Sequence, residues 1–274
     1  MDELYVIARR VLLDALGALG RHRDAVVLVG AQAIYLRVGE ADLAVAPFTT
    51  DGDLAVDPSI LAEIPPLEQA LTTAGFLPKS RDSVGIWVTQ RSTTTNVRAE
   101  VAIDLLVPAS VSPGKGRRAA RLTGHDSRVA RIVSGLDGAL VDVDTMSLAA
   151  LDADPRRFDV RVAGPAALLV AKVHKINERK GTDRQSDKDA LDVLRLLRGT
   201  STEELEQRYR ALLADHRSRA PAGHAVLLVR EQFGTRDGLG VSMAIRSAGA
   251  LADADEIAAS CEALANDLLA LLSR

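Results

Sequence analysis

The sequence predicts an α+β fold, with a mixed sheet and flanking helices in the N-terminal part and a helical bundle in the C-terminal part. Two observations predict it. Up to residue 163, short apolar or alternating runs typical of strands recur between helical segments. From residue 165 onward, the periodic segments carry apolar residues at helical spacing, and none alternates like a strand. We therefore expect an α/β domain at residues 1–163 and a helical domain at residues 164–274.

The N-terminal part is expected to begin with a helix and a buried strand. Residues 4–19 carry apolar side chains every three or four positions and end at Gly20, a common helix stop. Residues 25–29 form a continuous apolar run, which is typical of a strand buried on both faces. Gly30 follows directly, and helical spacing resumes after it. The pattern predicts strand, glycine turn and helix.

The later elements follow from the same two periodicities. Residues 51–56 alternate charged and apolar residues like a half-buried strand, and residues 65–74 show helical spacing before Gly75. Further strands are expected at residues 84–89, 97–107, 139–146 and 158–162. Beyond Gly164, helices are expected at residues 165–179, 186–198, 203–214, 222–233 and 253–272.

Composition limits the classes of function. The formal net charge of −3 argues against non-specific binding of duplex DNA, and an aromatic content of 3% disfavours a base-stacking sheet. One cysteine, Cys261, cannot form an internal disulfide or a thiolate metal cage, which fits a reducing compartment. No apolar stretch is long enough for a membrane span. We expect a cytoplasmic protein without membrane association.

Three aspartates are the strongest candidates for chemistry. Asp51 and Asp53 lie two residues apart on a predicted strand, so their carboxylates face the same side with Cα atoms about 7 Å apart. Such charges repel unless a cation binds them, and carboxylate oxygens suit Mg²⁺ or Mn²⁺. The alternative is a solvent-facing strand surface. Asp104 is the only charge in an apolar run, so it either completes a metal site or pairs with Arg98 or another basic residue.

A glycine turn precedes these acids. Gly30 and Ala31 connect a predicted strand to a predicted helix. Backbone N–H groups at such a helix N-terminus can bind an anion, and glycine lets the anion approach closely. The alternative is an ordinary strand–helix connection.

The order of these features resembles the nucleotidyltransferase superfold, and in particular the AbiEii-like toxin nucleotidyltransferases, which include the MenT group. The resemblance covers roughly residues 10–200. It is carried by LVGAQA at residues 28–33, TTDGDL at 49–54, IDLL at 103–106, and the helical segments ALLVAK at 167–172 and DKDALD at 187–192.

This resemblance implies an enzyme that uses Mg²⁺ or Mn²⁺ to transfer NMP from an NTP to an acceptor hydroxyl. Asp51, Asp53 and Asp104 would be catalytic and would hold the metal, while Gly30 and Ala31 would bind the triphosphate. Ala31 stands where the superfamily commonly has Ser or Gly, so backbone groups would make that contact. The implied acceptor is the 3′ end of tRNA, and the implied protein partner is a cognate antitoxin.

The helical part contributes further candidates. Lys172, Lys175 and Arg179 fall on one face of a predicted helix, which by composition alone is typical of a solvated surface. The resemblance implies instead that Lys172 is catalytic and binds the nucleotide, with Lys175 as the alternative lysine. It also places Asp189, and with it Asp192, in the nucleotide site, which the helical domain would complete.

A cluster of basic residues follows the loop after Asp104. It predicts an acceptor-binding patch, because RNA would bring its phosphates past the mouth of the site, whereas the alternative is a solvated loop and helix face. The cluster comprises Lys115, Arg117, Arg118 and Arg121.

Two other functions use the same residues. A small-molecule nucleotidyltransferase of the aminoglycoside-modifying type would share the three acids but would need no basic path for RNA. A non-catalytic binding module on the same fold would bind a partner without turning over nucleotide. The sequence leaves both open.

Overall fold

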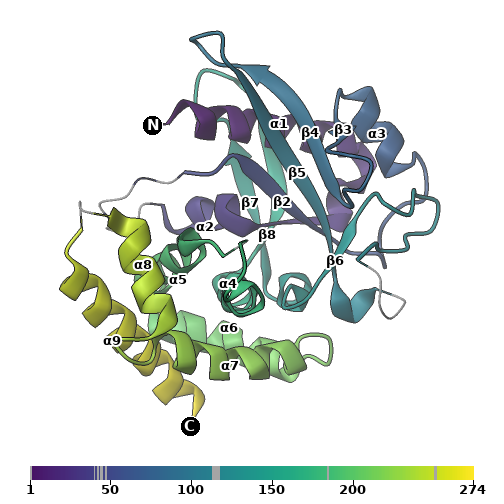
Figure 1. Cartoon of the computed structure of the whole chain (residues 1–274). Helices are drawn as coiled ribbons and strands as arrows, with labels where there is room; N and C mark the ends of the chain where they lie inside the picture. Colours follow the sequence, from purple (N-terminus) through teal and green to yellow (C-terminus); the bar gives the residue numbers. More distant parts are fainter. Residues whose placement is uncertain are drawn as a thin grey trace. The chain divides into compact units, whose positions relative to one another are not determined.

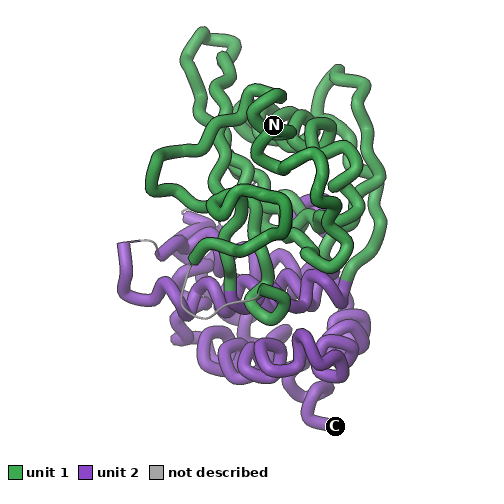
Figure 2. Tube along the Cα trace, turned by 90° about the vertical axis from the view of Figure 1, so that its right-hand side faces the viewer, with its two compact units in different colours: residues 1–33, 48–133, 143–163 green, residues 34–47, 134–142, 164–274 purple. Residues whose placement is uncertain are grey.

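The protein is described here by a computed structural model, shown in Figure 1, which describes residues 2–39, 41, 43, 46, 48–112, 118–183, 185–249 and 252–274. The chain divides into two compact units, coloured separately in Figure 2. Unit 1 comprises Met1–Ala33, Phe48–Val133 and Val143–Ala163. Unit 2 comprises Ile34–Pro47, Ser134–Asp142 and Gly164–Arg274.

Unit 1 is built on a mixed sheet, to which its described residues contribute eight strands in the order β3-β4-β5-β2-β1-β8-β7, with β6 paired to β5. Strand β2 runs antiparallel to β1 and parallel to β5, and β1 runs parallel to β8. The strands are β1 (Val26–Val29), β2 (Asp51–Val56), β3 (Leu77–Pro78), β4 (Ile86–Ser92), β5 (Arg98–Pro108), β6 (Arg131–Val133), β7 (Val143–Ala149) and β8 (Arg157–Ala163).

Helix α1 (Glu3–Leu19) lies across one face of this sheet, with α3 (Leu67–Thr73) beside it (Figure 1). Leu12 of α1 is fully buried, and a Cβ atom on Gly52 would lie 3.2 Å from its Cδ1 atom and 2.9 Å from Cδ1 of Ile103. The face that carries Gly52 and Ile103 is therefore covered by α1. Because successive strand residues point to opposite faces, Asp51 and Asp53 belong to the other face.

Unit 2 is helical. Helix α4 packs against α5, α6 and α7, and α9 packs against α6, α7 and α8. Helix α2 (Gly30–Val38) begins in unit 1 and ends in unit 2. The other helices are α4 (Pro165–Arg179), α5 (Asp187–Gly199), α6 (Thr202–Ala214), α7 (Arg219–Phe233), α8 (Leu239–Ala248) and α9 (Ala254–Leu272). Among the helices described, none has the length and hydropathy to cross a membrane.

The predicted α+β class, with its mixed sheet and C-terminal helices, is confirmed. One strand was placed wrongly, because residues Asp137–Leu140 form a 3-10 turn and the strand begins only at Val143. The short strands β3 and β6 and the helix α8 were not predicted. Gly240 interrupts the helical pattern of α8, yet a Cβ atom there would lie 2.4 Å from the Phe233 ring. The residue that weakens the sequence signal is the one that allows α8 to pack.

Candidate functional site

Strand pairing brings the three predicted aspartates of unit 1 together. In the parallel ladder of β2 and β5, Asp53 lies opposite Asp104 and Asp51 lies opposite Ala102. Paired residues on neighbouring strands point to the same face of a sheet, so all three carboxylates lie on the face opposite α1. All three side chains are partly exposed. The geometry therefore makes them accessible to a ligand on that face.

Gly30 directly adjoins Asp53. Its φ of +69° turns the chain from β1 into α2 without an intervening loop. A Cβ atom on Gly30 would lie 2.0 Å from Oδ2 of Asp53, since the preceding residue, Val29, pairs with Asp53. Glycine is thus required here both by the backbone conformation and by the approach of the carboxylate. The first turn of α2, which contains Ala31, therefore begins next to Asp53.

Three further side chains support Asp51. The hydroxyl of Thr49 donates to the Asp51 carboxylate, and Nε2 of Gln32 donates to the Asp51 carbonyl oxygen at 2.9 Å. Oε1 of Gln32 accepts from Nε of Arg9 at 2.8 Å, and both side chains are buried. Burial lowers the pKa of Arg9, and Tyr5 partly opposes this effect. The sequence feature that pointed to this supporting role is Gln32 itself, a polar residue within an apolar run.

Asp104 has a basic partner. Its Oδ2 atom forms an ion pair with the guanidinium of Arg131 on β6, and the two side chains are 13% and 27% exposed. Arg98, the partner named from the sequence, lies at the opposite end of β5, where it pairs with Ser92 of β4. The expected alternative of a basic partner is therefore realised, by Arg131.

Carboxylate oxygens of this kind fit Mg²⁺ or Mn²⁺, which prefer hard oxygen ligands. Asp51 and Asp53 on one strand face could hold such an ion, with Asp104 on the next strand as the third acid. Within the described ranges, no group of three or more His, Cys, Asp and Glu side chains is arranged to hold a metal. Asp104 faces Arg131 instead.

Unit 2 contains a second cluster of candidates around a buried lysine. Nζ of Lys172 donates to Oδ1 of Asp189 at 2.7 Å and to Oδ2 of Asp192 at 2.6 Å. The Tyr35 hydroxyl donates to Asp192 at 3.3 Å. Burial alone would lower the pKa of Lys172, but the two carboxylates raise it above its ordinary value. At 5% exposure, Lys172 is a charged residue held in the interior.

The neighbouring cations of α4 reach solvent. Nζ of Lys175 lies 3.0 Å from Oδ1 of Asp189, and the Lys175 side chain is 38% exposed. Nη1 of Arg179 lies 3.9 Å from Oδ2 of the same carboxylate. Of the two predicted lysines, Lys175 is the partly exposed one and Lys172 is buried, so Lys175 is the more accessible to an anionic ligand.

The predicted acceptor patch is described only in part. Lys115 and Arg117 lie outside the described residues. Arg118 and Arg121 are exposed. Their segment runs along β6, because Ala119 bridges to Arg131 and the Ile132 N–H donates to the Arg118 carbonyl at 2.7 Å. Both arginines therefore belong to the segment that lies beside Arg131, the ion-pair partner of Asp104.

Comparison with known proteins assigns the family. A family model described as nucleotidyltransferase (NTP_transf_8) matches residues 9–214, well over half of the chain. The chain belongs to this nucleotidyltransferase family. The nucleotidyltransferase is therefore an enzyme with an NTP as its substrate. No curated protein matched it.

Two solved structures are similar to the nucleotidyltransferase at low identity. An antigenic nucleotidyltransferase-like protein from Paracoccidioides brasiliensis has 15% identity and a TM-score of 0.41, with 82% of this chain and 93% of that chain covered. The antibiotic-resistance factor ANT(2'')-Ia has 13% identity and a TM-score of 0.43, with 81% of this chain and 96% of that chain covered.

The Gly30→Ala variant tests the approach of Gly30 to Asp53. We expect it to lose nucleotidyl transfer and to be destabilised by more than Gly75→Ala, because Gly75 also has positive φ but has open space around it. The backbone strain alone should cost about 1–2 kcal/mol in either variant. Urea unfolding and pyrophosphate release measure the two effects. Equal losses in both variants would contradict the proposed contact.

The Lys172→Met variant tests the buried ion cluster. It leaves Asp189 and Asp192 without their common partner, so the free energy of unfolding should fall by about 3–5 kcal/mol. Lys175→Met, which removes a more exposed partner of Asp189, should cost at most about 1 kcal/mol. Urea unfolding at pH 7 measures the loss of stability in both variants. Similar losses would contradict the expectation that the buried lysine contributes more to stability than the more exposed one.

Acid stability tests the same cluster. Burial raises the pKa of Asp189, but Lys172 and Lys175 lower it well below its ordinary value of 3.8. A depressed folded-state pKa gives stability that is present above the unfolded value and is lost as pH falls through it toward the folded value. We expect Asp189→Asn to be less stable than wild type at pH 6 but to lose less stability between pH 5 and pH 2. Thermal unfolding across that range measures both slopes, and parallel slopes would contradict the prediction.

Proposed function

We propose that this nucleotidyltransferase transfers NMP to an acceptor hydroxyl at the Asp51, Asp53 and Asp104 face of unit 1. The observation that carries this proposal is the strand register, which aligns the three acids on one face and places Gly30 against Asp53. The carboxylates alone would repel a phosphate, so a bound divalent cation and the helix N-terminus would have to offset their charge.

In this proposal each element of unit 1 has one task. The backbone of the Gly30-Ala31 turn binds the triphosphate. Asp51 and Asp53 would hold Mg²⁺ or Mn²⁺, which would supply charge neutralisation for the phosphates and make the acceptor hydroxyl more acidic. Asp104 accepts the proton of that hydroxyl, whose oxygen forms a bond to the α-phosphorus as the bond to pyrophosphate breaks. Arg131 orients Asp104.

In unit 2, we propose that Lys175 and Arg179 bind an anionic part of the substrate. Both lie near Asp189, and both side chains are partly exposed. Lys172 then acts as a positioning residue, because it holds Asp189 and Asp192 from the interior. The direct contact to the substrate is thus assigned to Lys175, which the sequence analysis named as the alternative to Lys172.

The proposed acceptor is the 3′ end of tRNA, and the proposed role is that of a toxin neutralised by a cognate antitoxin. The resemblance of the sequence to AbiEii-like toxins supports both. The exposed Arg118 and Arg121 beside β6 add support, since RNA phosphates passing Asp104 would meet them.

A labelling experiment tests the reaction and the acceptor together. The purified protein is incubated with Mg²⁺, total tRNA and each α-labelled NTP in turn, and the products are separated on a denaturing gel. We expect label in tRNA with one preferred NTP. Asp53→Asn should lower the rate by roughly two or more orders of magnitude, because the charge that holds the metal is halved on β2.

The matched control is Glu100→Gln, which removes a carboxylate from the exposed start of β5 and should leave the rate unchanged. Arg118→Gln with Arg121→Gln should weaken transfer to tRNA without changing NTP binding. If an aminoglycoside is labelled and tRNA is not, the acceptor is a small molecule and not tRNA. NTP binding without label in any acceptor would indicate a non-catalytic module and refute the proposal.

A further inference from the structure

The first turn of α2 contacts both acids of β2. Gly30 adjoins the carboxylate of Asp53, and Nε2 of Gln32 donates to the Asp51 carbonyl oxygen at 2.9 Å. Two residues of one helical turn thus meet two neighbouring acids, one through the space that a glycine leaves and one through an amide. The proposed triphosphate contact uses this same turn, so the bond from Gln32 fixes Asp51 relative to it.

The backbone groups of Asp51 face the β1 side of β2. The Asp57 N–H donates to the Ala25 carbonyl at 2.8 Å, which makes these two residues a hydrogen-bonded pair of the antiparallel ladder. Hydrogen-bonded pairs recur at every second residue of such a ladder, so the pattern runs from Asp57 through Asp53 to Asp51. The carbonyl of Asp51 is therefore directed toward the place where a continued β1 would lie.

Strand β1 ends before it can reach Asp51. Its last residue, Val29, pairs with Asp53, and the chain then turns into α2 at Gly30. The side-chain amide of Gln32 supplies the hydrogen bond that a continued strand would give. A carbonyl that loses its donor in a partly buried place raises the free energy of the fold, so this bond holds the start of β2.

Arg9 sets the orientation of the Gln32 amide. A guanidinium can only donate and a carbonyl can only accept, so the amide oxygen faces Arg9 and the amide nitrogen faces Asp51. Two further bonds hold the guanidinium, one to the Ala149 carbonyl at 3.0 Å and one to the Tyr5 hydroxyl at 3.2 Å. Turning the amide over would break both bonds of Gln32.

Arg9 is a buried cation whose acceptors are neutral. It is 3% exposed, and in the part of the chain that the structure describes its bonds go to an amide, a carbonyl and a hydroxyl. A buried charge without a counter-ion is costly, and an apolar side chain would avoid that cost. What the guanidinium supplies is a rigid, planar set of donors. Its place in the fold therefore indicates the task of holding Gln32.

We infer that Gln32 is a positioning residue for Asp51 and that Arg9 acts through it, by keeping the amide nitrogen turned toward β2. Gln32 fixes the backbone of Asp51, and the Thr49 hydroxyl holds its carboxylate. This inference rests on the proposed function. It assigns a role in the reaction to two buried side chains, neither of which contacts the substrate.

Binding of Mn²⁺ alone tests the positioning role without any reaction. The full-length protein is titrated with Mn²⁺ in the absence of NTP, and the free ion is measured by its electron paramagnetic resonance signal. Gln32→Met and Arg9→Met should each raise the dissociation constant by about 10- to 100-fold, as is typical of residues that hold metal ligands in place.

The matched control is Leu71→Ala in α3, which removes a fully buried side chain elsewhere in unit 1. It should lower the melting temperature without weakening the binding of Mn²⁺. If Leu71→Ala weakens binding as much as Gln32→Met at an equal loss of melting temperature, only stability matters and the proposal is overturned.

Gln32→Glu separates position from charge and from folding. A carboxylate at residue 32 still accepts from Arg9 and gives that cation a counter-ion, but it cannot donate to the Asp51 carbonyl. We expect a melting temperature closer to wild type than that of Gln32→Met, with Mn²⁺ binding still weaker than wild type. By charge alone, Gln32→Glu and Arg9→Met would both bind Mn²⁺ more tightly than wild type, and that result would overturn the proposal.

A double variant tests whether Arg9 acts through Gln32. Arg9→Met should add no further loss of Mn²⁺ affinity to that of Gln32→Met, because no amide then remains to be oriented. Additive losses would mean that Arg9 acts on the site independently, and they would overturn the proposed role of Arg9.

The labelling assay separates this inference from the proposed function. Weaker binding of Mn²⁺ by Gln32→Met and Arg9→Met, in a protein that transfers no NMP, would sustain the positioning role and refute the reaction. Transfer of NMP with wild-type kcat and wild-type Mn²⁺ binding in both variants would sustain the reaction and refute the positioning role.

Discussion

The carboxylate of Asp53 occupies the space that a side chain on Gly30 would need, and the geometry of the candidate site in unit 1 follows from this approach. Antiparallel pairing of β1 with β2 sets Val29 opposite Asp53, and the positive φ of Gly30 starts α2 at once. Parallel pairing with β5 then adds Asp104. A slip of one residue in β2 would turn its acids toward Leu12 of α1, on a face where even a Cβ atom at residue 52 is crowded.

Unit 2 is organised around charge rather than only around apolar contacts. Lys172 of α4 holds Asp189 and Asp192 of α5, and all three side chains are buried. Each group alone would be costly in the interior, so the cluster stabilises the pairing of these helices only as a complete set. Lys175 shares Asp189 from the exposed side. The buried Lys172 thus fixes the position of Asp189, and Asp189 in turn orients the more exposed Lys175.

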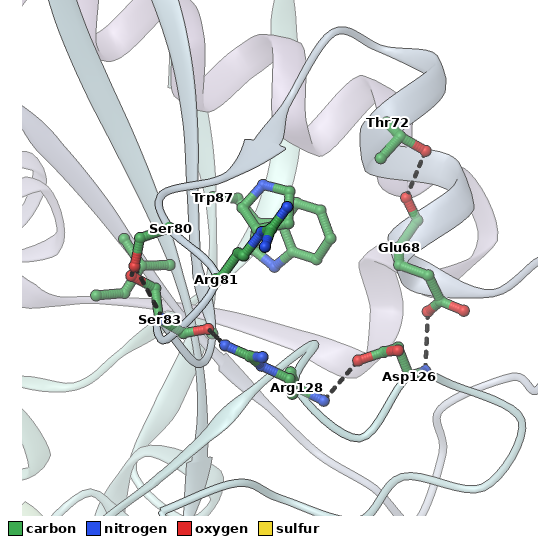
Figure 3. Close-up of a pocket in the computed structure, with 11 residues that line it drawn as sticks. Glu68, Thr72, Ser80, Arg81, Ser83, Trp87, Asp126 and Arg128 are labelled. Carbon is green, nitrogen blue, oxygen red and sulfur yellow. Dashed lines mark hydrogen bonds between the residues drawn. The ribbon is translucent and has the colours of Figure 1, made fainter.

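The two faces of the sheet of unit 1 carry different surfaces. On the β1 side of the acids lies a turn of backbone groups with no side chain at Gly30, which suits a phosphate chain. On the face that α1 and α3 cover lies a cavity lined by Trp87 and by two arginines, Arg81 and Arg128 (Figure 3). The three acids lie on the opposite face, on the neighbouring strands β2 and β5.

Local periodicity and residue type were sufficient to predict the α+β class and most helices and strands, and to single out the three acids and the glycine turn as candidates. Asp51 and Asp53 share a face whatever the neighbouring strands are, since that follows from the period of a strand. Contacts between distant parts of the chain were needed to show that Asp104 lies beside Asp53, that Arg131 rather than Arg98 pairs with it, and that Lys172 is buried. Strand register and helix packing join residues distant in the chain, and no local pattern encodes which of several basic residues comes within reach of a given acid.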